Sequence, residues 1–331
     1  MQLLSYKFLI VLILFNGVSL LSASNGDRSP FYQKCLKNCV RSNCTEDGKD
    51  FNPTEAERPV TTNLLSTWNC LDECQYDCMW RAVDAFKNLG YDIPKFYGKW
   101  PFKRILGVQE PGSVFASFLN LAAHVYMYKE FMQQFPVTEH DKIGLFWHFF
   151  ALVCVNGWSW SIFFHMKDSP FSEFMDYAGA LSMVMIMFIA AVIRVFENHR
   201  KLKNAIVSVS AAMHVLHVYY LYCAVIDYDY NMMVNLVFGV AGGALWAGEG
   251  AARCARGRGR GGGRLLAFVL LSAAALSLEL LDFPPYYDTW DAHALWHLAT
   301  VPLPLLFWRY VIDDLQYTRR EQAAKAHLKM A

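Results

Sequence analysis

Seven apolar stretches of membrane length follow one another after residue 110 of this 331-residue chain. Each is close to the roughly 20 residues that a helix needs to cross a bilayer. Polar backbone groups inside lipid must be satisfied within the segment, so helix is the expected structure. We therefore predict an all-α membrane protein with seven transmembrane helices, at 111–131, 143–165, 175–195, 204–225, 232–250, 265–281 and 291–311.

The composition agrees with this fold class and excludes others. The chain is 55% hydrophobic and only 18% charged, which is too apolar for an ordinary soluble protein. A formal net charge of +1 gives no reason to expect nucleic-acid binding. The Arg- and Gly-rich run at 256–264 is interpreted as a flexible cytosolic loop rather than a nucleic-acid contact.

The beginning of the chain predicts entry into the secretory pathway. Residues 1–24 combine Lys7, an apolar core and small residues at the end, which is typical of a cleavable signal peptide; an uncleaved first membrane helix is the alternative. The connectors after the third and fifth spans and the tail at 313–331 are rich in Arg and Lys, whereas the connectors on the opposite side are mainly acidic. The positive-inside rule then predicts a lumenal N-terminal domain and a cytosolic tail.

The domain predicted at 25–108 is small and rich in cysteine. Its Cys-x3-Cys spacings place neighbouring thiols on one helix face, and in an oxidising lumen they predict a disulfide framework. The sequence does not choose among the possible pairings, and a zinc cluster is the alternative. Asn43 begins a glycosylation sequon. The six cysteines of the domain are Cys35, Cys39, Cys44, Cys70, Cys74 and Cys78, whereas Cys154, Cys223 and Cys254 are expected to be packing residues or cytosolic thiols.

Four ionisable residues lie at ends of predicted spans that face the same side of the membrane: His165, Asp176, His293 and His297. Such residues are costly at membrane depth and indicate a functional site. His293 and His297 are four residues apart, which stacks them on one helix face. Three imidazoles bind zinc and leave one position open for water. We therefore predict a zinc site formed by the three histidines.

Two further groups fit a hydrolytic role beside that zinc. The carboxylate of Asp176 can orient water or accept its proton. Ser161 lies one turn before His165, where its hydroxyl can donate to a developing oxyanion. The alternatives are an interfacial His165, an Asp176 that stabilises a helix N-terminus and a Ser161 that packs between helices.

Other polar residues of the spans have more than one interpretation. His214 and His217 can form a second polar site, and His124 and His148 are expected to pack or form hydrogen bonds. Glu279 and Asp282 are either partners of metal-bound histidines or interfacial acids.

Several motifs carry a resemblance to a known family. Ser-x3-His at 161–165, the following Asp176 and His-x3-His at 293–297 resemble the CREST superfamily of seven-helix proteins. The segments at 96–102, 109–111, 175–177, 278–285 and 291–297 resemble its GPI-anchor fatty-acid remodelling family over nearly the whole chain. The region around 242–264 departs from that pattern.

The resemblance implies a function and a location. It implies a membrane enzyme of the Golgi apparatus, with the endoplasmic reticulum as a second location, that acts on GPI-anchored proteins. Its reaction would be a phospholipase A2-type removal of the unsaturated sn-2 acyl chain. It also implies that His165, His293 and His297 bind Zn²⁺, with Asp176 and Ser161 as catalytic residues. A non-enzymatic seven-helix receptor or GPI-protein sorting factor with a structural zinc, and a ceramidase-like amidase, are the alternatives.

Overall fold

A computed structural model describes residues 24–52, 68–138, 141–224, 226–257 and 259–330. Apart from Ser24, the predicted signal peptide lies outside the described residues. The described residues fall into two compact units, the first ending at Pro101 and the second beginning at Phe102. Each unit is described by itself, and the domain division at 108 stays a prediction.

The first unit is a pair of helices joined by disulfides. Helix α2 (Pro30–Asn43) is capped by the Ser29 hydroxyl, which accepts a hydrogen bond from the Tyr32 backbone N–H at 3.2 Å. Helix α3 (Cys70–Asn88) begins with a capping box between Asn69 and Asp72.

Three disulfides connect these helices. The paired cysteines follow opposite orders along α2 and α3, so the two helices are antiparallel. The predicted disulfide framework is confirmed. The sulfur atoms of Cys44, Cys70 and Cys74 also lie close together, but they belong to disulfides and offer no thiolate to a zinc ion. The disulfides are Cys35–Cys78, Cys39–Cys74 and Cys44–Cys70.

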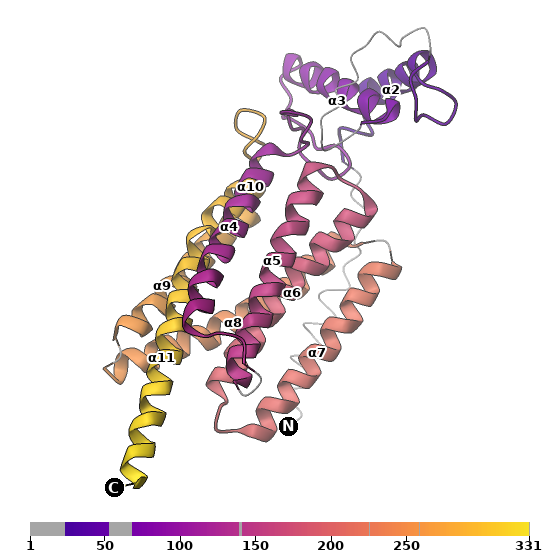
Figure 1. Cartoon of the computed structure of the whole chain (residues 1–331). Helices are drawn as coiled ribbons and strands as arrows, with labels where there is room; N and C mark the ends of the chain where they lie inside the picture. The colour runs from indigo at the N-terminus through magenta and orange to yellow at the C-terminus, as the bar shows by residue number, and fades with distance from the viewer. Residues whose placement is uncertain (1–23, 53–67, 139–140, 225, 258, 331) are drawn as a thin grey trace, which may run out of the picture. The chain divides into compact units, whose positions relative to one another are not determined.

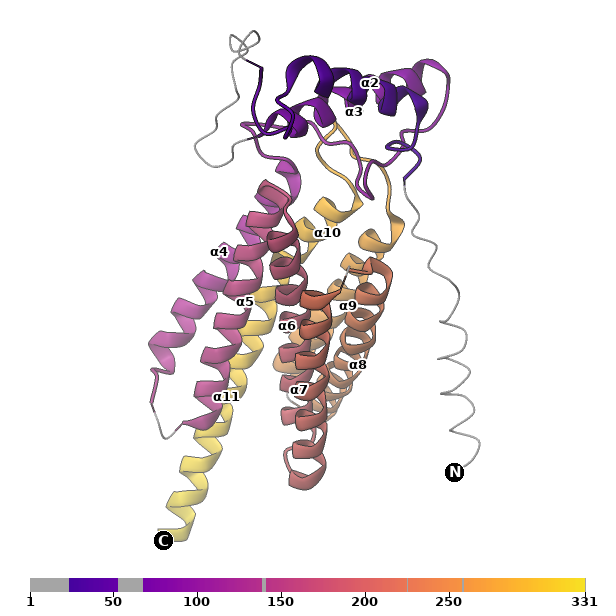
Figure 2. The same ribbon diagram turned by 90° about the vertical axis from the view of Figure 1, so that its right-hand side faces the viewer.

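The second unit is a bundle of long helices (Figure 1). Helix α7 packs mainly on α6; it lies at the right-hand edge of the bundle in Figure 1 and faces the viewer in Figure 2. Its outward face carries large apolar side chains such as Leu216 and Tyr219, each more than half exposed, as expected for a surface in lipid. The helices are α4 (Pro111–Gln134), α5 (Lys142–Met166), α6 (Pro170–Val195), α7 (Arg200–Cys223), α8 (Tyr228–Ala255), α9 (Gly259–Leu281), α10 (Ala292–Thr300) and α11 (Pro302–Met330).

The helices confirm the predicted all-α class and follow the seven predicted spans closely. Six of the described helical segments are long and apolar enough to cross a membrane, the last running from α10 into α11. Helix α4 is not among these six, so the number of seven spans stays a prediction. Helices α10 and α11 divide the span predicted at 291–311 at Val301, just before Pro302, whose ring lacks an N–H for the helical ladder.

The glycine-rich segment is not the flexible loop that its composition predicted. Helix α9 already begins at Gly259, and the connection from α8 includes a turn in which Gly257 has φ +75°. The glycines let α8 and α9 approach closely: a Cβ on Gly262 would lie 2.6 Å from the Gly250 carbonyl oxygen. Small residues favour this contact between membrane helices, and it overrides the weak helix propensity of glycine.

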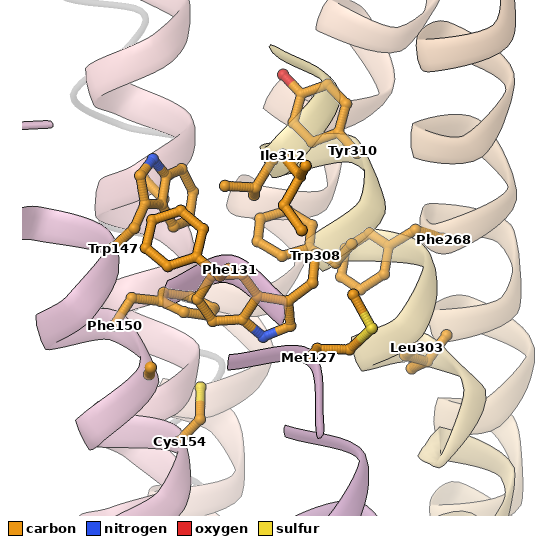
Figure 3. Packing of buried hydrophobic residues seen from close by; sticks show 14 of the residues in the cluster. Met127, Phe131, Trp147, Phe150, Cys154, Phe268, Leu303, Trp308, Tyr310 and Ile312 are labelled. Atoms are coloured by element: carbon orange, nitrogen blue, oxygen red, sulfur yellow. The ribbon is translucent and has the colours of Figure 1, made fainter. Parts of the chain in front are cut away.

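A large aromatic core fills the half of the bundle that lies away from the predicted histidine site (Figure 3). Trp308 is completely buried there and donates its indole N–H to His124 Nδ1 at 3.4 Å. The Tyr128 hydroxyl lies 3.2 Å from His148 Nδ1. The expectation that these two histidines pack and form hydrogen bonds is confirmed.

A network of ion pairs lies at the same end of the bundle. The Arg253 guanidinium on α8, with only 4% of its side chain exposed, contacts Glu249 at 2.7 Å and pairs with Asp314 on α11. Arg194 on α6 shares both acids, at 3.0 Å from Glu249 and 3.4 Å from Asp314. The network therefore joins α6, α8 and α11 by buried charges that depend on one another.

Candidate metal centre

Three imidazoles meet at the end of the bundle where α5 ends and α10 begins. One ring nitrogen from each of His165, His293 and His297 lies within 4.8 Å of the other two. The Nε2 atoms of His293 and His297 are 2.9 Å apart, and the His165 ring centroid is 5.2 Å from each of the other two. His165 and His297 are 2% and 4% exposed, so two of the rings are removed from solvent.

Each imidazole is held by its other nitrogen. His165 Nδ1 lies 2.6 Å from Glu110 Oε2, and His293 Nδ1 lies 2.7 Å from Glu279 Oε2. His297 Nδ1 lies 3.3 Å from Ser117 Oγ. A carboxylate only accepts, so the first two rings carry a proton on Nδ1 and direct Nε2 toward the common centre.

This arrangement fits a metal ion. The Nε2 atom of His165 is buried and has no hydrogen-bond partner among the described residues. A neutral His293 with its proton on Nδ1 also presents a lone pair, and this faces the Nε2 atom of His297 at 2.9 Å. A cation at the centre satisfies all three nitrogens, and a set of three imidazoles is a common ligand set of catalytic zinc.

Helix α4 holds the site from one side, which sequence reasoning missed. Glu110, Ser117 and Asn120 recur at spacings that place them on roughly one helix face. The Asn120 amide donates to the His297 carbonyl oxygen at 2.7 Å, and the backbone N–H of Glu110 donates to the His165 carbonyl at 3.0 Å. The sequence signal for this role is the presence of polar residues in an otherwise apolar helix. Glu110 also belongs to the motif at 109–111, to which the family resemblance assigned no function.

Ser161 lies beside this group on α5, whereas Asp176 lies on α6. Ser161 is 3% exposed and its Oγ lies 3.1 Å from Ser117 Oγ. Asp176 lies in the second turn of α6, is partly buried, and is not one of the residues whose ligand atoms gather with the three histidines. Its catalytic role stays a prediction.

The two acids after the sixth predicted span have different positions. Glu279 contacts His293, and its other oxygen accepts a hydrogen bond from the Tyr228 hydroxyl at 2.9 Å. Asp282 follows the end of α9 with φ +41°. The sequence allowed Glu279 to be either a partner of a metal-bound histidine or an interfacial acid, and the structure shows it as a partner of His293.

Two tryptophan rings and one capping carboxylate lie close to the histidines. The rings of Trp158 and Trp296 lie 5.3 Å and 4.7 Å from the His297 ring. Asp291 caps α10 by accepting from the Ala294 N–H at 2.8 Å.

The other intramembrane histidines lie outside this centre. His217 Nε2 is 3.0 Å from Asn231 Oδ1, and His214 Nε2 is 3.3 Å from Ser182 Oγ. They contact separate partners on α8 and α6, and neither belongs to the group of three imidazoles.

Comparisons with known proteins agree with the resemblance seen in the motifs. The model of the Per1-like family matches residues 59–315. The chain is 40% identical to "Post-GPI attachment to proteins factor 3" of Drosophila melanogaster over 91% of this chain and 92% of the relative. It is 36% identical to "GPI-specific phospholipase A2-like PGAP3" of Cricetulus griseus and 34% identical to the Homo sapiens protein of the same name, each over 96% of this chain and 98% of the relative.

Proposed function

Because this chain belongs to the Per1-like family, we propose that it remodels GPI anchors by hydrolysing the sn-2 acyl ester of their lipid. The names of its relatives support a role on GPI-anchored substrates and a phospholipase A2-like reaction. In this proposal the reaction depends on zinc, and the unsaturated acyl chain leaves as a fatty acid.

The observation that carries this proposal is the convergence of three anchored imidazoles. Each ring has a partner at Nδ1 and directs Nε2 to one buried point. The point lies near the ends of apolar helices, which is the depth at which the ester bonds of a membrane lipid are found. A Zn²⁺ ion held there supplies a Lewis acid and lowers the pKa of a water molecule to about 7.

Two side chains are assigned the remaining steps. In the proposal Asp176 accepts a proton from the attacking water, and Ser161 donates a hydrogen bond to the oxygen that becomes negative. Trp158 and Trp296 keep bulk water away from the histidines, which strengthens these polar interactions.

The proposed location follows from the charge of the connectors. The positively charged connectors favour a cytosolic position for the opposite end of the bundle. The histidine end then faces the lumen of the Golgi apparatus or the endoplasmic reticulum, where GPI-anchored proteins present their lipid. The disulfide-bonded first unit also fits an oxidising lumen.

A structural zinc is the second candidate, because His165 and His297 are almost fully buried. One variant separates the candidates in cells that lack this protein and carry a GPI-anchored reporter. If zinc is catalytic, Ser161→Ala keeps the metal and the folded protein but does not restore remodelling. If zinc is structural, Ser161→Ala restores remodelling fully.

The readout is mass spectrometry of the acyl chains on the reporter. Wild type is expected to remove the unsaturated chain, His297→Ala is expected to leave it in place, and His214→Ala serves as a control imidazole outside the centre. Metal analysis of each purified variant shows whether zinc or only activity was lost. Full remodelling by His297→Ala would overturn the proposed function.

A further inference from the structure

Ser117 connects two parts of the candidate site that come from different helices. It lies on α4 and is completely buried, with 0% exposure. Its Oγ lies 3.1 Å from Ser161 Oγ on α5 and 3.3 Å from His297 Nδ1 on α10. The three groups form a continuous chain of polar contacts in an apolar surrounding, where such contacts are strong.

Both hydroxyls are turned away from the bond that a helical serine usually makes. Ser159, Ser182 and Ser272 each donate to the carbonyl four residues earlier, at 2.7, 2.6 and 2.7 Å. Ser117 and Ser161 form no such bond in the described structure and face each other instead. Their arrangement is therefore set by the site and not by the local preference of serine in a helix.

The chemistry of the imidazole fixes the direction of this chain when a metal is held. A ring that gives its Nε2 lone pair to a cation carries its proton on Nδ1. His297 then donates from Nδ1 to Ser117 Oγ, which leaves the Ser117 proton to donate to Ser161. The proton of Ser161 remains available, because Ser117 is its only hydrogen-bond partner among the described residues.

We propose that Ser117 is a positioning residue that makes the Ser161 hydroxyl a hydrogen-bond donor to the substrate oxygen. It does so by accepting from His297 and donating to Ser161, with every proton remaining on its own atom. This inference rests on the proposed function, in which the oxygen belongs to an acyl ester. Ser117 then links the histidine group to Ser161, because the orientation of the His297 ring sets the direction in which the Ser161 hydroxyl donates.

The test uses the full-length protein, purified with saturating zinc, and a GPI-anchored reporter that carries an unsaturated sn-2 chain. Ser161→Ala is expected to lower kcat about 100-fold, as for loss of an oxyanion donor. Ser117→Ala is expected to lower kcat about 10-fold with KM unchanged. The double variant is expected to be no slower than Ser161→Ala alone, because the two residues act as one unit.

Ligand binding supplies a second readout that needs no turnover. A phosphonate analogue of the lipid carries a tetrahedral anion in place of the ester, whereas an ether analogue carries none. Ser117→Ala is expected to weaken phosphonate binding about 10-fold and to leave ether-lipid binding unchanged. Ser117→Thr keeps the hydroxyl and is expected to restore both kcat and phosphonate binding.

Ser113 offers a matched control one turn earlier on α4. It is 1% exposed and its hydroxyl has no hydrogen-bond partner in the described structure, so Ser113→Ala is expected to change nothing. If Ser117→Ala does not fold, Ser117→Cys keeps the shape with a weaker donor and is judged by the same criteria.

Two results would overturn the inference. One is a Ser117→Ala variant with the kcat and the phosphonate affinity of wild type. The other is a double variant whose fold-loss of kcat equals the product of the fold-losses of the two single variants. If wild type releases no fatty acid, the proposed function fails, and phosphonate binding alone decides the role of Ser117.

Discussion

Glu279 and His293 lie on consecutive helices, and the Oε2 atom of the first is 2.7 Å from the Nδ1 atom of the second. The carboxylate is largely buried, with 6% of its side chain exposed. It fixes the orientation of the ring and makes Nε2 a better electron donor. The same relation is repeated between Glu110 and His165 at 2.6 Å, so two of the three imidazoles are held by acids.

The first prediction concerns this carboxylate. Glu279→Gln removes the negative charge and is expected to weaken zinc binding about 10- to 100-fold, because the ring is less basic and less firmly held. Competition with a coloured chelator measures the affinity. Glu197→Gln is a suitable control, since that side chain is 56% exposed and pairs with Arg194. Unchanged zinc affinity in the Glu279 variant would show that the carboxylate does not support a metal.

The second prediction concerns the disulfide framework. Peptide mapping without reduction is expected to yield the pairs Cys35–Cys78, Cys39–Cys74 and Cys44–Cys70. Replacing both Cys39 and Cys74 by serine is expected to destabilise the first unit by about 2–5 kcal/mol. Cys223→Ala, at a free and exposed cysteine, is the control. Recovery of a different pairing would contradict the antiparallel arrangement of α2 and α3.

The third prediction concerns the buried ion pairs. Among the described residues, Arg253→Met leaves Glu249 and Asp314 with only Arg194 to balance them, and it is expected to lower stability by about 3 kcal/mol. Thermal unfolding in detergent measures the change as a lower Tm. Arg256→Met is the control, because Arg256 is exposed at the end of α8. Equal Tm values for the two variants would mean that the network adds nothing to stability.

The fourth prediction concerns acid. The pKa of Asp141 is lowered because its carboxylate accepts from the Gly144 N–H at 2.8 Å and from Arg319 at 2.9 Å. A lowered pKa gives stability above the unfolded value of about 3.9, and this stability is lost as pH falls through the folded value. Asp141→Asn is therefore expected to reduce the fall of Tm on acidification below about pH 4. Parallel pH profiles for the variant and wild type would exclude this contribution.

Much of the fold follows from the apolar pattern alone. Helices α5 to α9 lie where membrane-length stretches predicted them, because length and apolarity leave no other structure in lipid. His293 and His297 follow from their spacing on one helix face. Their meeting with His165 was predicted from topology, and the structure brings the three rings together.

The partners of the histidines were less accessible to sequence reasoning. Ser117 and Asn120 contact His297 from 180 and 177 residues away, and no local pattern indicates which face of α4 turns toward α10. The composition of the glycine-rich start of α9 predicts a loop instead of a helix for a related reason. Its helix is stabilised by close contact with α8, which composition does not reveal.

The contact between Ser117 and His297 also has a consequence for how the protein is made. A ribosome completes α4 early and α10 almost last, so most of the chain is already synthesised when the two can meet. Until then, Glu110 and His165 are polar groups in a membrane without the third helix of their site. A chain that stops before residue 290 would leave these groups without His293 and His297. We therefore expect cellular quality control to recognise α4 and α5 in such truncated chains.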